Sequence, residues 1–315
     1  MSAYVLRRTL QMIPVVIGVI VLLFLALYIL PSDPAATLTG NRPVPEDFRE
    51  ALNERYGLDQ PLPDQVGRYL SNLVRLDFGE SVISRRPVRD ILFERIPDSA
   101  RLALAGFLFL AVLGIGSGVL SAARRGSAAD TGVTLATVVL VSVPVFVLGA
   151  LLQIFVALKT KDVLGLPVSG LRDGWRSYVL PGFTLAAVST AYLSRVQRAS
   201  LLETLDTDYV RAARARGLRR SRVLFRHAWR ASLVPVVTYL AVDLGGFIGG
   251  AILTETVFNI NGLGRTIAVA IEQGDNPVVL AVTTFIVLVY LVVNLIVDLS
   301  YAALDPRIRI EGKAS

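Results

Sequence analysis

Residues 102–123, LALAGFLFLAVLGIGSGVLSAA, form a run without a charged side chain between Arg101 and the pair Arg124–Arg125. A helix needs about 20 apolar residues to cross the hydrocarbon layer of a bilayer, so this run predicts a transmembrane helix. Five other stretches are similarly apolar: 9–30, 131–158, 177–194, 231–258 and 276–304. The sequence therefore predicts an all-α, polytopic membrane protein with six transmembrane helices. The stretch 131–158 is long enough to tilt or to contain a bend at Pro144.

The composition of the whole chain agrees with this class. The chain has 315 residues, of which 53% are hydrophobic and 18% charged, and its mean hydropathy is +0.59. Soluble domains carry about 25% charged residues. The chain contains no Cys and a single His, His227, which excludes disulfide scaffolds, zinc fingers and thiol nucleophiles. Because His227 has no evident carboxylate partner, we expect a structural role for it, and no catalytic residue, metal site or cofactor.

Basic residues predict the side of the membrane that each loop faces, because Lys and Arg are retained in the cytoplasm. The segment 195–230 carries ten Arg against three acidic residues, whereas 31–98 carries nine basic and twelve acidic residues. With six spans, this bias places both termini in the cytoplasm and the segment 31–98 outside. We attribute the Arg-rich loop to this retention and to contact with membrane lipid, and expect no nucleic-acid binding.

The external segment 31–98 is too long for a simple loop, and its periodicity is typical of short amphipathic helices. The first predicted helix is 46–56 and the third is 88–96. The second, 64–78, places five apolar side chains on one face: Val66, Tyr69, Leu70, Leu73 and Val74. Such helices would form a cap that serves either as a lid or as a docking surface for a partner.

The Arg-rich loop contains a more informative pattern, TDYVRAARARG at 207–217. Thr207 or Asp208 can cap the start of a helix, and Gly217 can end it in a left-handed turn. One face of this helix carries an aromatic and two small side chains: Tyr209, Ala212 and Ala213. Small residues allow a partner backbone to approach closely, so we predict a helix that docks into a groove of another protein. A second helix, capped by Ser221, is expected to follow it toward the membrane.

This loop resembles the cytoplasmic motif of permease subunits of type I ABC importers, which reads E-A-A-x3-G. Ala212, Ala213 and Gly217 match the motif, while Arg211 stands at the position of its Glu. The sequence Arg-Ala-Arg-Gly-Leu at 214–218 is similar to the dipeptide and oligopeptide permease subfamily. Further segments resemble the same subfamily: 6–8, 30–34, 55–59, 77–79, 255–258, 262–264 and 304–307.

The resemblance implies a type I ABC importer permease fold and a division of labour among subunits. In that family two permease subunits form the pathway, two cytoplasmic ATPase subunits drive it, and an external substrate-binding protein delivers the substrate. Short peptides are the implied substrate, and the bacterial inner membrane is the implied location. The chain contains no G-x-x-x-x-G-K-[ST] motif, so ATP hydrolysis is expected on another polypeptide.

The same resemblance implies roles for parts of this chain. Residues 1–98 would hold the first span and the external insert, 99–304 the permease core, and 305–315 a cytoplasmic tail. The loop 195–232 would couple the core to the ATPase. The residues implied in this coupling are Asp208, Tyr209, Ala212, Ala213 and Gly217.

Three carboxylates interrupt the apolar spans, where an ionisable group is costly and often functional. Asp243 lies roughly 15 Å into a span that begins near Leu233, close to the midplane. It either lines the translocation path beside a peptide amino group or contributes to a helix interface. Glu255 and Asp298 are expected near the two membrane surfaces, within reach of water. The glycines that follow Asp243 predict close helix packing or a hinge: Gly245, Gly246, Gly249 and Gly250.

The alternative function is an ion-coupled secondary transporter that acts without ATPase partners. Such carriers build midplane sites from paired ionisable groups or broken helices in two related halves. A single midplane carboxylate and the lack of an evident internal repeat disfavour this alternative. An intramembrane hydrolase is disfavoured as well, because the chain offers no usable pair of nucleophile and base.

Overall fold

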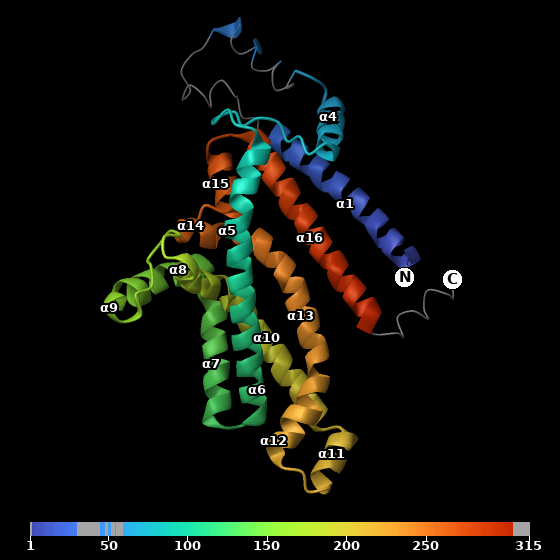
Figure 1. Ribbon diagram of the computed structural model, residues 1–315, viewed down its shortest axis with the longest axis vertical. Helices are drawn as coiled ribbons and strands as arrows, with labels where there is room; N and C mark the ends of the chain where they lie inside the picture. Colours follow the sequence, from blue (N-terminus) through green and yellow to red (C-terminus); the bar gives the residue numbers. More distant parts are fainter. Residues whose placement is uncertain (1, 30–44, 48–49, 52–53, 55–58, 305–315) are drawn as a thin grey trace. The chain divides into compact units, whose positions relative to one another are not determined.

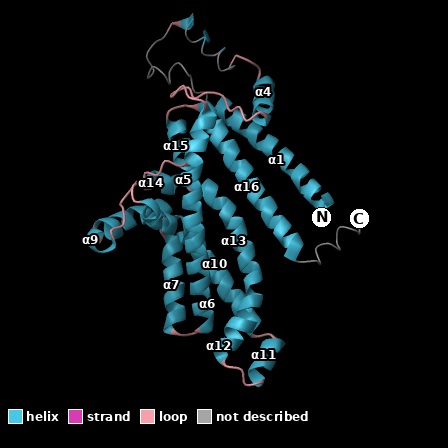
Figure 2. Cartoon of the chain, viewed as in Figure 1, coloured by secondary structure: helices cyan, strands magenta, loops and turns pink. Residues whose placement is uncertain are grey.

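The computed structural model describes residues 2–29, 45–47, 50–51, 54 and 59–304 (Figure 1). These residues form helices joined by turns (Figure 2), and the β feature among them is one isolated bridge between Glu80 and Pro87. The α-helices in chain order are α1 (Ser2–Ile29), α4 (Leu62–Val74), α5 (Val88–Phe109), α6 (Ile115–Ala123), α7 (Ala128–Ser142), α8 (Val145–Leu152), α9 (Lys161–Leu164), α10 (Val179–Leu205), α11 (Asp208–Ala215), α12 (Arg220–Arg222), α13 (Trp229–Gly250), α14 (Ile252–Val257), α15 (Leu263–Glu272) and α16 (Asn276–Leu304). The all-α prediction is confirmed for this part of the chain.

The chain divides into two compact units. Unit 1 comprises Met1–Ser99 and Asn261–Ser315, and unit 2 comprises Ala100–Ile260. In the structure α15 and α16 belong to unit 1 and not to the unit that contains α10. The physical reason is their packing, because α16 lies along α1 and α15 packs on α16 (Figure 1).

Unit 1 is held together partly by Tyr69 of α4. Its ring makes an edge-to-face contact with Phe24 of α1, and its hydroxyl donates to Thr284 Oγ1 of α16 over 3.1 Å. Burial raises the pKa of Tyr69 to about 12, against the opposing effect of the Thr284 hydrogen bond.

The three amphipathic helices predicted for the segment 31–98 have different outcomes. The first, 46–56, lies largely outside the described residues. The second is α4, whose predicted inner face is partly buried except for Val74, which is 87% exposed because the helix ends there. The third is not a separate helix, because α5 continues from Val88 through Pro97 to Phe109. Pro97 has no backbone N–H, so the helix lacks one hydrogen bond at that point. Val88 and Leu92 are buried in the core of unit 1, where they hold the first turns of α5.

The central helix of unit 2 is α10, which packs against α6, α7, α8 and α13. Glycines on the neighbouring helix permit this close approach. A Cβ on Gly118 would lie 2.6 Å from the carbonyl oxygen of Ser194, and a Cβ on Gly114 would lie 2.7 Å from Leu193 Cδ2. The buried surface of α10 also includes polar side chains, among them Gln197, whose Nε2 donates to Ser232 Oγ of α13 over 3.0 Å.

The described residues contain three helical stretches that are long and apolar enough to cross a membrane: Thr9–Leu27, Val88–Ala123 and Asn276–Val297. A fourth candidate is the pair Ala128–Ser142 and Val145–Leu158, which is bent by 107°. Of the two possibilities that its length allows, a tilt or a bend at Pro144, the structure has the bend. The other two predicted spans correspond to α10 and α13, which are long but fall outside this apolar set. The sequence of α10 contains Arg195, Arg198 and Glu203 as well as buried polar side chains such as Gln197, and all of these lower its mean hydropathy.

Candidate functional site

The predicted helix in the Arg-rich loop is α11. Its preceding residue, Thr207, has an extended backbone, and its hydroxyl donates to Thr204 O over 2.6 Å and does not cap the helix. At the other end Gly217 has a φ of 74°, and its N–H donates to Arg214 O over 3.0 Å. The left-handed termination predicted at Gly217 is confirmed, and it favours glycine because a Cβ is strained at this φ.

The structure divides the residues of α11 between an inner and an outer face. Val210 is fully buried and Ala213 is 8% exposed, and both pack in a hydrophobic cluster with Ala122, Leu201, Val223 and Ala228. Asp208 and Ala212 are exposed, and Tyr209 is 50% exposed. The predicted common face of Tyr209, Ala212 and Ala213 is therefore split, because Ala213 contacts its own chain. The apolar pair Val210 and Ala213, three residues apart, is the sequence signal for this inner face.

The helix expected after α11 is present, but its start differs from the prediction. It begins at Arg220, so Ser221 lies inside it and is not its cap. A π-helical segment, Val223–Ala228, joins α12 to α13 without a break. Arg220 also donates from its guanidinium to Ala123 O at the end of α6, over 2.9 Å. The helix α11 packs against the π-helical segment Val223–Ala228 and against α10.

A partly buried ion pair, which is not among the features predicted from the sequence, joins α7 to α10: the Arg198 side chain is 35% exposed and that of Asp130 is 10% exposed. Arg198 donates from Nε to Asp130 Oδ1 over 3.0 Å and from Nη2 to Oδ2 over 2.9 Å. Asp130 also accepts from the hydroxyl of Ser121 and, over 3.0 Å, from the N–H of Gly126. The pair thus ties the turn between α6 and α7 to the helix that leads into α11. The sequence signal is Ser127-x-x-Asp130, a helix-start pattern in which Ser127 Oγ accepts from Asp130 N.

Asp243 lies on α13 and is partly buried against α10. The hydroxyl of Ser189 hydrogen-bonds to the Asp243 carboxyl group. The other carboxyl oxygen, Oδ2, is enclosed and has no hydrogen-bond partner among the described residues. A buried acceptor that lacks a hydrogen-bond donor lowers the stability of the folded state by about 1–3 kcal/mol. A conformation that supplies a donor to Oδ2 would therefore be stabilised.

The other two carboxylates predicted within apolar spans are Glu255 and Asp298. The Asp298 side chain lies outside the described part. Glu255 was expected near water, but it is fully buried in the first turn of α14. The reason is that α13 ends at Gly250, and the short helix α14 then packs on α8.

The glycines after Asp243 do not share one environment. Gly245 is buried and Gly249 is partly buried, whereas Gly246 is exposed, and a Cβ there would meet nothing within 4 Å. Gly250 is the last residue of α13. Gly246 therefore makes no close helix contact within the described part of this chain. Gly114 and Gly118, in and just before α6, do make close helix contacts. They are four residues apart, and this small-xxx-small spacing predicts such contacts from the sequence.

Two family matches cover most of the chain. Residues 114–310 match the family described as "Binding-protein-dependent transport system inner membrane component", and residues 1–103 match the corresponding N-terminal family. The chain belongs to this family. It is a permease subunit of a binding-protein-dependent ABC importer, and the ion-coupled alternative is therefore not supported.

Relatives align along nearly the whole chain. The glutathione transport system permease protein GsiC of Escherichia coli (strain K12) is 37% identical over 310 residues, which cover 98% of this chain and 99% of GsiC. GsiC of Shigella flexneri serotype 5b (strain 8401) aligns with the same identity and coverage. This permease also shares its fold with the inward-facing MetNI methionine ABC transporter in its CY5 native crystal form. That likeness has a TM-score of 0.55 and 19% identity, and it covers 68% of this chain and 96% of the other.

Proposed function

We propose that this permease and a second permease subunit form the pathway by which short peptides enter the cell. Two separate cytoplasmic ATPase subunits drive the movement, and an external binding protein delivers the peptide. The substrate class is supported by the GsiC relatives, which are named for the transport of glutathione, a peptide-like molecule.

One observation supports the coupling role of α11. The inner face of this helix packs against its own chain, which leaves the outer face exposed and available to a partner. The outer face combines small Ala212 with half-exposed Tyr209, which suits insertion into a shallow groove of a partner. Asp208 adds a charge at the helix start, and Gly217 sets where the helix ends. In this proposal Ala213 supports the helix from behind and does not touch the ATPase.

The proposed orientation places both termini, α11 and the turn between α6 and α7 in the cytoplasm, with the segment 31–98 outside. The distribution of Arg supports it. The loop 195–232 is the coupling segment of the permease core. In this arrangement α10 and the element α12–α13 connect α11 to the membrane, so a push on α11 acts on both helices.

We assign the exposed surface of α13 at Gly246 to contact with the second permease subunit. The support is Gly246, which is exposed and has open space where a side chain would lie. Asp243 is one helical turn away on the same helix. For Asp243 the translocation path and the helix interface both remain candidate locations.

Reconstitution of the full transporter tests the function. The two permeases and two ATPases are placed in vesicles with ATP on the ATPase side, and the binding protein with radiolabelled glutathione or dipeptide is added on the other. We expect uptake only when ATP, both ATPases and the binding protein are all present. Uphill accumulation by this permease alone would refute the proposal.

A further inference from the structure

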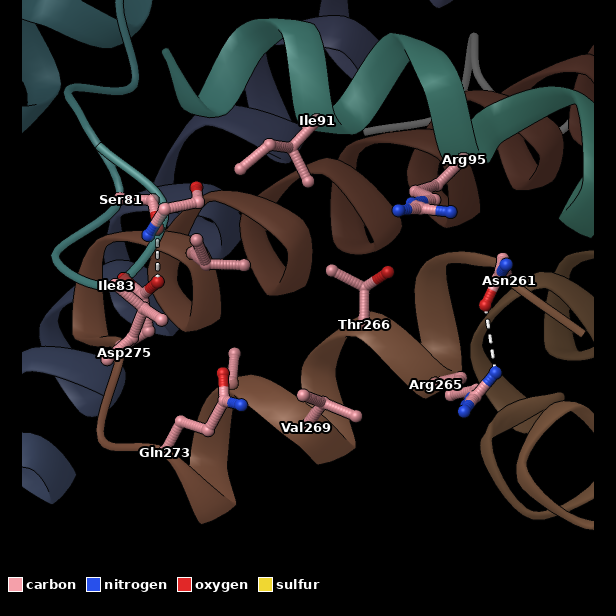
Figure 3. Close-up of a pocket in the computed structure, with 13 residues that line it drawn as sticks. Ser81, Ile83, Ile91, Arg95, Asn261, Arg265, Thr266, Val269, Gln273 and Asp275 are labelled. Carbon is pink, nitrogen blue, oxygen red and sulfur yellow. Dashed lines mark hydrogen bonds between the residues drawn. The ribbon is translucent and has the colours of Figure 1, made fainter. Parts of the chain in front are cut away.

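A pocket of about 300 Å³ lies within unit 1, between the turn at 81–84, the first turns of α5, and α15 (Figure 3). Arg95 of α5 and Arg265 of α15 both line it, together with Thr266 and Asn261. Its apolar wall includes Ile91 and Val269. The pocket thus combines two guanidinium groups with an apolar wall.

The only carboxylate among the residues that line the pocket, that of Asp275, accepts hydrogen bonds from its own chain. Asp275 is 4% exposed and accepts from Ser81 Oγ over 2.5 Å and from Val82 N over 3.1 Å. Ser81 Oγ in turn accepts from Ser84 N over 3.0 Å. These bonds use both oxygens of Asp275 to hold the turn that forms one wall. The other charged residues that line the pocket are Arg95 and Arg265.

The two arginines differ in their contacts. Arg265 donates to Asn261 Oδ1 over 2.8 Å, as Figure 3 shows. Arg95 makes no hydrogen bond or ion pair with any described residue, although its charge acts on the neighbouring Glu94. A guanidinium presents donors in a planar fork that matches the two oxygens of a carboxylate. The pocket is therefore suited to a carboxylate ligand.

The shape of the pocket favours a carboxylate carried by a protein. Its rim is open, with Ile83 and Val269 each 37% exposed and Asn261 and Gln273 exposed as well. Sites for free small molecules usually bury about 70–90% of the ligand surface. A side chain projecting from a docked protein needs no such enclosure, since the partner itself covers the rim.

The position of the pocket along α5 fits an external partner. Arg95 precedes the apolar run 102–123 by seven residues, which is roughly 10 Å along a helix. The guanidinium thus lies beyond the hydrocarbon layer, at the end of α5 that the proposed orientation places outside. We propose that this pocket receives an acidic side chain of the external substrate-binding protein. The inference rests on the proposed function and its orientation.

The test measures how tightly the binding protein attaches to the complete transporter in nanodiscs. We expect Arg95→Gln to raise the Kd about tenfold, as expected for losing one charge-assisted hydrogen bond, and to weaken the salt dependence of binding. Arg95→Lys should recover part of the affinity. Arg86→Gln is the matched control, because Arg86 is an exposed external arginine paired with Glu94 and lies outside the pocket. Equal Kd values for Arg95→Gln and the wild type would overturn the proposal.

A second measurement separates docking from substrate binding. At saturating binding protein, Arg95→Gln should transport peptide at the wild-type rate, because only docking is weakened. Binding of free peptide to the transporter without the binding protein, if abolished by Arg95→Gln, would make the pocket a substrate site and overturn the proposal.

If Arg95→Gln fails to assemble, a photoreactive residue at Ile83 tests the same contact. It should capture the binding protein beside an Asp or Glu, and capture at a surface without acidic residues would contradict the inference. Failure of the proposed function would look different, since the wild-type transporter would then show no uptake that depends on ATP and the binding protein.

Discussion

Ala212 and Ala213 are neighbours in the sequence, yet Ala213 is buried in the cluster beneath α11 and Ala212 lies exposed on its surface. The inner alanine holds the helix to the permease. The outer alanine belongs to the surface that we assign to the ATPase. The same substitution, Ala to Glu, therefore tests docking at position 212 and packing at position 213.

We expect Ala212→Glu to assemble with its partner subunits in detergent but to abolish ATP-driven uptake. A long charged side chain on the outer face would prevent close approach of the ATPase. Uptake in reconstituted vesicles and co-purification of the ATPase measure the two effects. Ala128→Glu is the control, because Ala128 is an exposed alanine in the first turn of α7. Normal uptake by Ala212→Glu would refute the docking role of this face.

Ala213→Glu should act differently and reduce the amount of folded permease. The site is enclosed by Val210, Leu201 and Val223, and burial of an unpaired carboxylate there is strongly unfavourable. Fluorescence-detected size-exclusion chromatography of both variants gives the comparison. A well-folded Ala213→Glu protein would show that the cluster is open enough to admit a charge.

Asp130→Asn should lower the thermal unfolding temperature of the complex by several degrees. The amide keeps the shape of the side chain but removes the charge that receives both hydrogen bonds of Arg198. We also expect fewer peptides transported per ATP hydrolysed, because the pair links the α6–α7 turn to the helix that leads into α11. Asp162→Asn on α9, an exposed carboxylate, is the control. An unchanged ratio of transport to hydrolysis would limit the pair to stability.

Gly118→Ala should destabilise the permease by about 1–3 kcal/mol, which is the usual cost of overpacking a well-packed contact. The added Cβ would meet the backbone oxygen of Ser194, which has little freedom to move within α10. Gly116→Ala is a close control, because the same atom there meets nothing within 4 Å. Thermal unfolding in detergent compares the variants, and equal stabilities would show that α6 and α10 shift apart at little cost.

Asp243→Asn should leave the preference for free over N-acetylated peptides unchanged while it alters the transport rate. The reason is that Oδ2 of Asp243 is enclosed by its own chain, so the carboxylate is not presented to a peptide amino group in this conformation. Competition uptake with the two peptide forms measures the preference. A loss of discrimination would place Asp243 in the translocation path.

The sequence by itself determined the membrane class, the long apolar helices, the left-handed turn at Gly217 that follows α11, and the family. These features depend on local composition, on periodicity, and on motifs of a few adjacent residues. The spans that cross as plain apolar helices were predictable because lipid selects apolar side chains on every face. The predicted spans at α10 and α13 were harder to establish, because a helix surrounded by protein can carry polar side chains such as Gln197.

The tertiary structure alone decided which side chains meet. Asp130 and Arg198 are 68 positions apart, and nothing in either local sequence names the other as its partner. The same holds for Gly118 with Ser194, and for the pocket formed where α5 and α15 come together. The physical reason is that helical periodicity defines faces, whereas the choice of neighbour for each face depends on how all the helices pack at once.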